Sequence, residues 1–100
     1  MSVKINRQSG IYSNKYHGNG FQITFDNGWT VSVQWHKAAY CTRIDDSSAS
    51  NCEVAVWNSE GQWFSFLEDR LLDNGQTDVM DHVEMEDLAS IINRVSIFQD

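Results

Sequence analysis

Alternating apolar and polar positions between Phe21 and Trp35 give the clearest structural signal in the chain. A period of two is that of a strand with one buried face. The tripeptide Asp26-Asn27-Gly28 interrupts the alternation, and its Asn-Gly pair favours a type I′ turn because both residues tolerate a positive φ. The pattern predicts a β-hairpin with these residues turned toward the core: Phe21, Ile23, Phe25, Trp29, Val31, Val33 and Trp35. The polar residues between them suit a hydrated outer face: Gln22, Thr24, Thr30, Ser32 and Gln34.

Similar alternation predicts a second pair of strands, Cys52 to Asn58 and Gln62 to Leu67. Residues 3 to 5 could add a short edge strand. The period then changes to 3.6 between Glu84 and Ile97, which indicates an amphipathic helix. Its apolar face consists of Leu88, Ile91, Ile92 and Val95, extended by Met85 and Phe98.

The charges near the ends of this helix agree with its dipole. Glu84, Glu86 and Asp87 stand in or before the first turn, and Arg94 stands near the last. The order of elements predicts a single α+β domain over residues 1–100, with an antiparallel meander of about four strands and a C-terminal helix packed on one face. A loop rich in Gly, Asn and Tyr is expected at residues 9–20.

Composition and charge restrict the class of protein. The chain has 100 residues, a net charge of −7 and no proline. Residues 1–44 carry five basic residues and one acidic residue, whereas residues 45–100 carry thirteen acidic residues and two basic ones. No apolar run approaches the ~18 residues of a membrane span, and the N-terminus lacks the apolar segment of a signal peptide. We therefore expect a soluble protein of the cytoplasm that does not bind membranes.

The sequence contains no recognisable catalytic or metal-binding motif. Cys41 and Cys52 are separated by ten residues, which matches no common zinc pattern, and they are expected to be free, partly buried thiols. The three histidines, His17, His36 and His82, stand in different segments without a carboxylate or thiol at catalytic spacing. We expect a protein that is not an enzyme and that uses neither a metal nor another cofactor.

Acidic residues are concentrated between Glu68 and Asp87, where Arg70 is the only basic residue. Such a surface can imitate phosphate toward a DNA- or RNA-binding protein and accelerate the encounter. The competing interpretation is a hydrated face that promotes solubility. The residues expected to contact a partner are these carboxylates and two aromatic residues: Glu68, Asp69, Asp73, Asp78, Asp81, Glu84, Glu86, Asp87, Trp57 and Trp63.

The N-terminal loop supports an alternative hypothesis. Tyr12, Lys15, Tyr16 and His17 are residues of the kinds that stack on a base and hold a phosphate. On this hypothesis the protein binds and sequesters a small nucleotide signal, with a homo-oligomer to complete the pocket. The structural interpretation is that the tyrosines cap one end of the sheet. Binding along a long nucleic acid is not expected, because the acidic remainder of the chain would repel phosphate.

The stretch YHGNGFQITFDNGWTVSVQW, Tyr16 to Trp35, resembles a group of small tailed-bacteriophage accessory proteins that share the core NGF.ITF.NGWTVSVQ. These proteins have a strand similar to Ala55-Val56-Trp57-Asn58, followed by Glu60-Gly61 and Trp63, and a short C-terminal helix. The chain departs from the group at His36, where a glycine is expected, and no proline opens its helix. The resemblance marks a family rather than an activity.

The resemblance implies a phage accessory protein that acts in the host cytoplasm, where such proteins antagonise host defence or redirect host machinery. With the acidic stretch, it leads us to expect direct binding and inhibition of a host defence or nucleic-acid-handling protein. Blockade would be steric and electrostatic. Sequestration of a nucleotide signal is the alternative, and a minor structural or packaging role in the virion is a third hypothesis.

Overall fold

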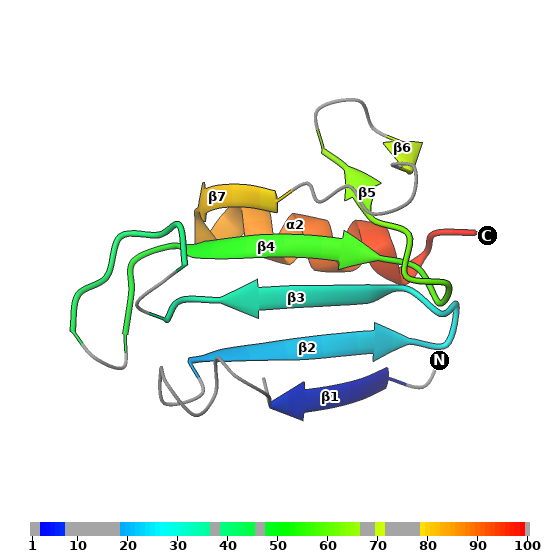
Figure 1. Cartoon of the computed structure of the whole chain (residues 1–100), viewed down its shortest axis with the longest axis horizontal. Helices are drawn as coiled ribbons and strands as arrows, with labels where there is room; N and C mark the ends of the chain where they lie inside the picture. The colour runs from blue at the N-terminus through cyan, green and yellow to red at the C-terminus, as the bar shows by residue number, and fades with distance from the viewer. Residues whose placement is uncertain are drawn as a thin grey trace.

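The computed structural model describes residues 3–7, 19–36, 39–45, 48–66, 70–71 and 79–99. Figure 1 shows an antiparallel sheet with helix α2 (Met85–Ser96) behind it. The strands of this sheet follow the order β1 (Val3–Arg7), β2 (Gly20–Phe25), β3 (Thr30–Gln34), β4 (Cys52–Trp57) and β7 (Val79–Val83). The predicted α+β fold, an antiparallel meander with a C-terminal helix on one face, is confirmed.

The hairpin of β2 and β3 pairs Phe21 with Val33 and Ile23 with Val31, as the alternation predicts. The turn of this hairpin differs from the predicted type I′ turn. The positive φ falls on Gly28 (88°) and not on Asn27, and the Gly28 N–H donates to the Phe25 carbonyl at 2.9 Å. This is the pattern of a three-residue loop with glycine in the left-handed region, so the type I′ prediction is wrong. Asn27 instead uses its side chain, whose Oδ1 accepts from the Trp29 N–H at 3.0 Å.

The core lies between the sheet and α2. Val31, Val33, Val54 and Val56 are at most 1% exposed, and Trp29 is 3% exposed. From the helix, Leu88 and Val95 are buried against them, while Ile91, Ile92 and Phe98 pack at the margin. The face bearing Trp29, Val31 and Val33 is therefore the one that the helix covers, as predicted. The helix was expected between Glu84 and Ile97, and these two residues are its caps.

The chain after β4 differs from a simple continuation of the meander. Trp57 and Trp63 form a single bridge, after which β5 (Phe64–Ser65) pairs with β6 (Arg70–Leu71) in a separate two-stranded sheet. Phe64 turns into the core, where its ring meets Trp29 edge to face at a centroid distance of 6.2 Å. The place beside β4 is taken by β7, which the sequence did not reveal.

The outer face of the sheet is drier than its polar residues suggest. Ser32 is 1% exposed and Thr30 6% exposed, so the prediction of a hydrated face is wrong at these two positions. The Gln34 side-chain amide donates to Ser32 Oγ at 3.2 Å, and the hydroxyls of Thr24 and Thr30 lie 2.9 Å apart. The small hydroxyl residues are therefore buried, and their oxygens take part in hydrogen bonds.

Candidate functional site

Four of the predicted partner-binding carboxylates surround the junction between β7 and α2. Asp81, Glu84, Glu86 and Asp87 are all exposed, and we call this group the acidic corner. Asp81 Oδ1 lies 3.0 Å from His82 Nδ1. Across the ranges that the structure describes, no lysine or arginine forms an ion pair with the other three. The corner is therefore a local excess of negative charge on a fixed strand and helix.

The remaining acidic candidates, Glu68, Asp69, Asp73 and Asp78, lie outside the described residues. The same holds for the alternative ligand-binding set: Tyr12, Lys15, Tyr16 and His17. The N-terminal loop predicted at 9–20 also lies outside them, except for its last two residues.

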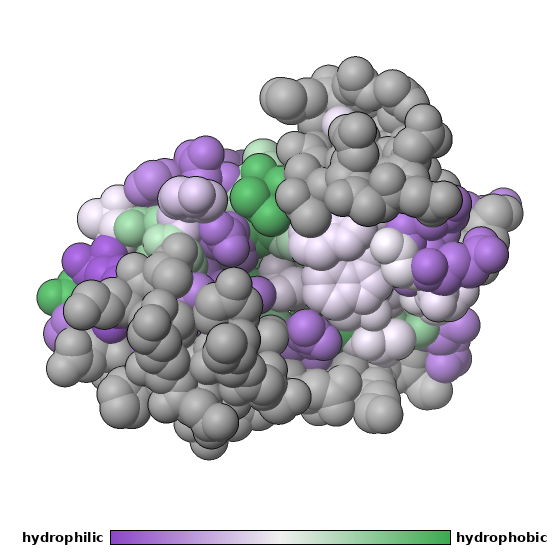
Figure 2. Space-filling view, in the orientation of Figure 1, coloured by the Kyte–Doolittle hydropathy of each residue, from purple (hydrophilic) through white to green (hydrophobic). Residues whose placement is uncertain are grey.

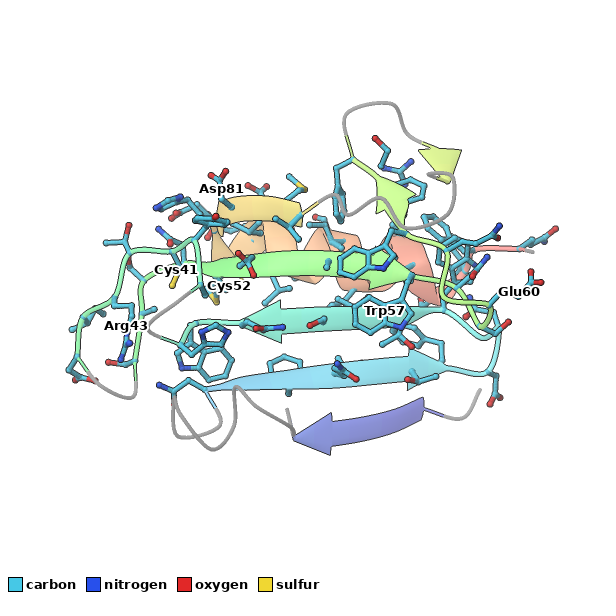
Figure 3. All side chains as sticks on the ribbon, viewed as in Figure 1. Cys41, Arg43, Cys52, Trp57, Glu60 and Asp81 are labelled. Atoms are coloured by element: carbon cyan, nitrogen blue, oxygen red, sulfur yellow. The ribbon has the colours of Figure 1, made fainter. Side chains whose placement is uncertain are left out.

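The two predicted aromatic contacts lie apart from the acidic corner. The rings of Trp57 and Trp63 pack against each other with centroids 5.1 Å apart, and both side chains are half-buried. They stand at the C-terminal end of β4. Asp81 lies near the N-terminal end of the same strand, where its charge contributes to the raised pKa of Glu53. Figure 3 shows Trp57 and Asp81 at opposite ends of the sheet. The predicted partner-binding residues thus form two patches.

Tyr40 is an aromatic residue at the acidic corner that sequence reasoning missed. Its backbone carbonyl accepts from the His82 N–H at 2.9 Å, and its backbone N–H donates to Glu53 Oε2 at 3.1 Å. The Tyr40 side chain is nevertheless 63% exposed. Tyrosine is one of the residue types enriched among those that dominate protein interfaces.

Burial shifts the pKa values of two ionisable residues of this region, Glu53 and His36, toward the neutral forms. Burial raises the pKa of Glu53, the hydrogen bond from Tyr40 opposes this, and Asp81 adds to the rise. Burial, aided by Arg43, lowers the pKa of His36, whose imidazole forms a hydrogen bond with the Gln34 side chain. His36 and Glu53 are thus buried or half-buried, whereas Tyr40 and the residues of the acidic corner are exposed.

Both cysteines are free thiols, as predicted. Burial raises the pKa of Cys41 and raises that of Cys52 to about 11, with further contributions to Cys52 from Cys41 and Glu84. Since the thiolate is the nucleophile and the metal ligand, these thiols are poorly suited to either role at neutral pH. Among the described residues, no three side chains of His, Cys, Asp or Glu are grouped closely enough to hold a metal ion.

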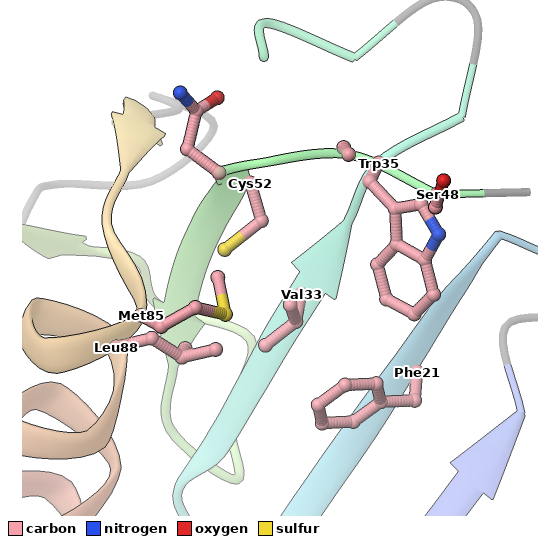
Figure 4. A pocket seen from close by; sticks show the side chains of 9 residues that line it. Phe21, Val33, Trp35, Ser48, Cys52, Met85 and Leu88 are labelled. Carbon is pink, nitrogen blue, oxygen red and sulfur yellow. The ribbon is translucent and has the colours of Figure 1, made fainter. Parts of the chain in front are cut away.

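A pocket of about 310 Å³ opens beside the acidic corner on the helix side of the sheet. Figure 4 shows Met85 and Leu88 of α2 on one side of it, Phe21 and Trp35 on the other, and Val33 and Cys52 between them. The loop before β4 completes the lining with Ser48, Ala49 and Asn51. A sheet of five strands is about 19 Å wide and a helix only about 10 Å, so α2 alone cannot cover the whole apolar face. That mismatch is the signal from which the pocket could have been expected.

The outer surface is mixed in character. Figure 2 shows weakly polar residues near the centre of the outer face and strongly hydrophilic ones toward its ends. No helix within the described ranges has the combination of length and apolar composition that crossing a membrane requires.

Comparison with protein-family models, with curated proteins and with solved structures gave no match.

Proposed function

We propose that this protein is a non-enzymatic phage accessory protein that binds and inhibits a defence or nucleic-acid-handling protein of the bacterial host through the acidic corner. The observation that carries the proposal is the group of four exposed carboxylates around the β7–α2 junction, with the exposed Tyr40 beside them. The phage and host assignments come from the resemblance of the Tyr16–Trp35 stretch.

The charges suit a basic partner. Three of the four carboxylates, Glu84, Glu86 and Asp87, stand at the start of a helix, and the backbone holds them in fixed relative positions. Negative potential concentrated on one corner steers a basic protein toward it, and the attraction weakens as salt is added. Tyr40 would supply the apolar contact that charge alone does not give. Inhibition follows because the partner's nucleic-acid-binding surface is occupied.

The alternative, sequestration of a nucleotide signal, is less well supported. Among the described residues that line the pocket beside α2 there is no lysine or arginine, and the lining residue Asn51 is hydrogen-bonded to the carboxylate of Glu84. A phosphate-bearing ligand would lose its hydration there without gaining a counter-charge. The loop residues proposed for nucleotide binding, Tyr12, Lys15, Tyr16 and His17, remain a separate prediction.

The test is affinity capture of the tagged protein from bacterial host cells, followed by native mass spectrometry of the material eluted by rising salt. The expected result is a stoichiometric basic protein, released by salt. Retention of that protein by the variant D81N/E84Q/E86Q/D87N, with its fold intact by circular dichroism, would contradict the proposal. A small extra mass on the protein would favour the nucleotide hypothesis instead.

A matched pair of single variants separates local from general charge effects. Glu86→Gln and Glu60→Gln each remove one exposed carboxylate, the first at the acidic corner and the second in the turn after β4. An exposed ion pair contributes about 0.2–1 kcal/mol, so Glu86→Gln should weaken binding by up to about fivefold. Glu60→Gln should leave the affinity unchanged. Tyr40→Ala should weaken binding in a way that added salt does not alter.

A further inference from the structure

We infer that the pocket beside α2 receives a large apolar side chain from a basic segment of the partner, so that one apolar anchor and its flanking Lys or Arg residues are recognised together. The inference rests on the proposed function and specifies the chemistry of the partner.

The shape and lining of the pocket select an apolar group. Val33 and Cys52, which are 1% and 2% exposed, form its floor, and the rings of Phe21 and Trp35 meet edge to face at a centroid distance of 6.0 Å on one side. A volume of about 310 Å³ is at the lower end of the range for ligand pockets, which suits one bulky side chain. Met85, 49% exposed, lies at the rim, where its flexible thioether can adjust to the guest.

The polar side chains of the lining already have partners. Asn51 Oδ1 accepts from the Thr42 N–H at 2.7 Å, and Asn51 Nδ2 donates to Glu84 Oε2 at 3.3 Å. Ser48 Oγ donates to Asp45 Oδ1 at 2.9 Å. These bonds hold the loop against the start of the helix. An apolar guest leaves these bonds intact.

The rim determines the charge of the occupant. Glu84, whose carboxylate is hydrogen-bonded to the pocket residue Asn51, precedes Met85 at the edge of the pocket, and Glu86 and Asp87 of the acidic corner follow Met85 on the first turn of the helix. A segment that places an apolar side chain in the pocket therefore brings its neighbouring residues toward Glu84 and the acidic corner. Positive neighbours are attracted and negative ones repelled. A second copy of this chain in the pocket would bring two acidic corners together, and their like charges would repel each other. The charge therefore favours a basic partner.

Fluorescence anisotropy with labelled synthetic peptides tests the inference. The probes are a lysine-rich peptide with one central Phe, the same peptide with Ala in its place, and a third with Phe flanked by glutamates. Burial of a Phe side chain should make the Phe peptide bind at least about tenfold more tightly than the Ala peptide. The glutamate-flanked peptide should not bind. Equal binding of the Phe and Ala peptides would overturn the inference.

Two variants show where the anchor lies. Ala49→Phe fills the pocket and should abolish the preference for Phe over Ala. If Ala49→Phe does not fold, Met85→Lys serves, since Met85 is half exposed; it places a charge at the pocket and should also remove the preference for Phe. The variant E86Q/D87N should weaken both lysine-rich peptides by the same factor. A preference for Phe that persists in the filled or charged pocket would overturn the assignment.

The outcomes separate this inference from the proposed function. Tight binding of the glutamate-flanked Phe peptide would mean a pocket for apolar ligands in general, and a dimer in sedimentation that Ala49→Phe disrupts would mean a second copy. Either result overturns the inference. Salt-sensitive capture of a basic host protein by the Ala49→Phe variant, at wild-type affinity, would leave the proposed function standing without the anchor. Loss of all salt-sensitive binding by the wild type would remove both.

Discussion

The side-chain amide of Asn27 donates a hydrogen bond of 2.9 Å to the main-chain carbonyl of Val95, 68 residues further along the chain. The same Nδ2 lies 3.0 Å from the carbonyl of Phe98. The last carbonyls of a helix have no partner within it, and the Val95 carbonyl accepts here both from the Phe98 N–H, at 3.1 Å, and from the turn of the β2–β3 hairpin. One side chain thus joins the hairpin turn to the end of α2.

Replacement of Asn27 by Asp tests this connection. The substitution keeps the acceptor for the Trp29 N–H but removes the amide donor and places a carboxylate against two carbonyls. We expect a loss of about 2 kcal/mol in the free energy of unfolding, measured by urea titration. Glu60→Gln, in the exposed turn after β4, is the control and should stay within about 0.5 kcal/mol of the wild type. Equal stabilities of the two variants would show that the connection does not stabilise the fold.

Gly28 and Gly61 form a natural pair for comparison, since both have positive φ values, 88° and 79°. A Cβ at Gly28 would lie 3.1 Å from Ser59 Cβ, whereas a Cβ at Gly61 would meet nothing within 4 Å. Gly61→Ala should therefore cost only the conformational penalty of about 1–2 kcal/mol, and Gly28→Ala should cost more. The excess should shrink when Ser59→Gly is added, because the close contact disappears. Chemical denaturation of the single and double variants measures this coupling, and its absence would contradict the contact.

The raised pKa of Cys52 predicts that the folded protein loses stability at alkaline pH. Burial raises its pKa from the ordinary 9.0 to about 11, so above pH 9 the unfolded chain releases this proton while the folded chain retains it. The contribution of the protonated Cys52 thiol to the free energy of unfolding is complete below pH 9 and disappears as the pH rises through about 11. It amounts to about 2–3 kcal/mol at 1.36 kcal/mol for each pKa unit. Unfolding free energies of the wild type and Cys52→Ala, measured across this interval, should therefore converge or cross. Parallel curves would contradict the prediction.

Local patterns made much of the fold predictable. Seven apolar residues at alternate positions from Phe21 to Trp35 determine both the hairpin and the face that is buried, since a shift by one residue would expose them all. The 3.6-residue period of Leu88, Ile91, Ile92 and Val95 places the helix within one residue of its observed ends. In both cases the decisive interactions repeat along a short stretch of chain.

Features that depend on distant contacts were not predictable in this way. In β7, the consecutive polar residues Asp81 and His82 break the alternation, and His82 adopts a positive φ of 49°, so the strand has no clear period. The turn geometry depends on where the Asn27 amide binds. Ser32 is buried although its place in the alternation predicts a hydrated side chain, and the pocket exists because one helix is narrower than the sheet. Tyr40 was missed as a contact because its position follows from hydrogen bonds of its backbone to the Glu53 side chain on β4 and to the His82 N–H on β7.

Strand β7 and helix α2 follow each other with one residue, Glu84, between them. The sheet edge beside β4 and the apolar face that includes Val31 and Val33 are therefore completed by the same short stretch, residues 79–98. During synthesis, strands β1 to β4 leave the ribosome before this stretch does. Until it emerges, the nascent chain carries an open strand edge and an uncovered apolar sheet, the two surfaces most prone to aggregation. Interrupted translation before residue 79 should thus yield a product that chaperones must retain.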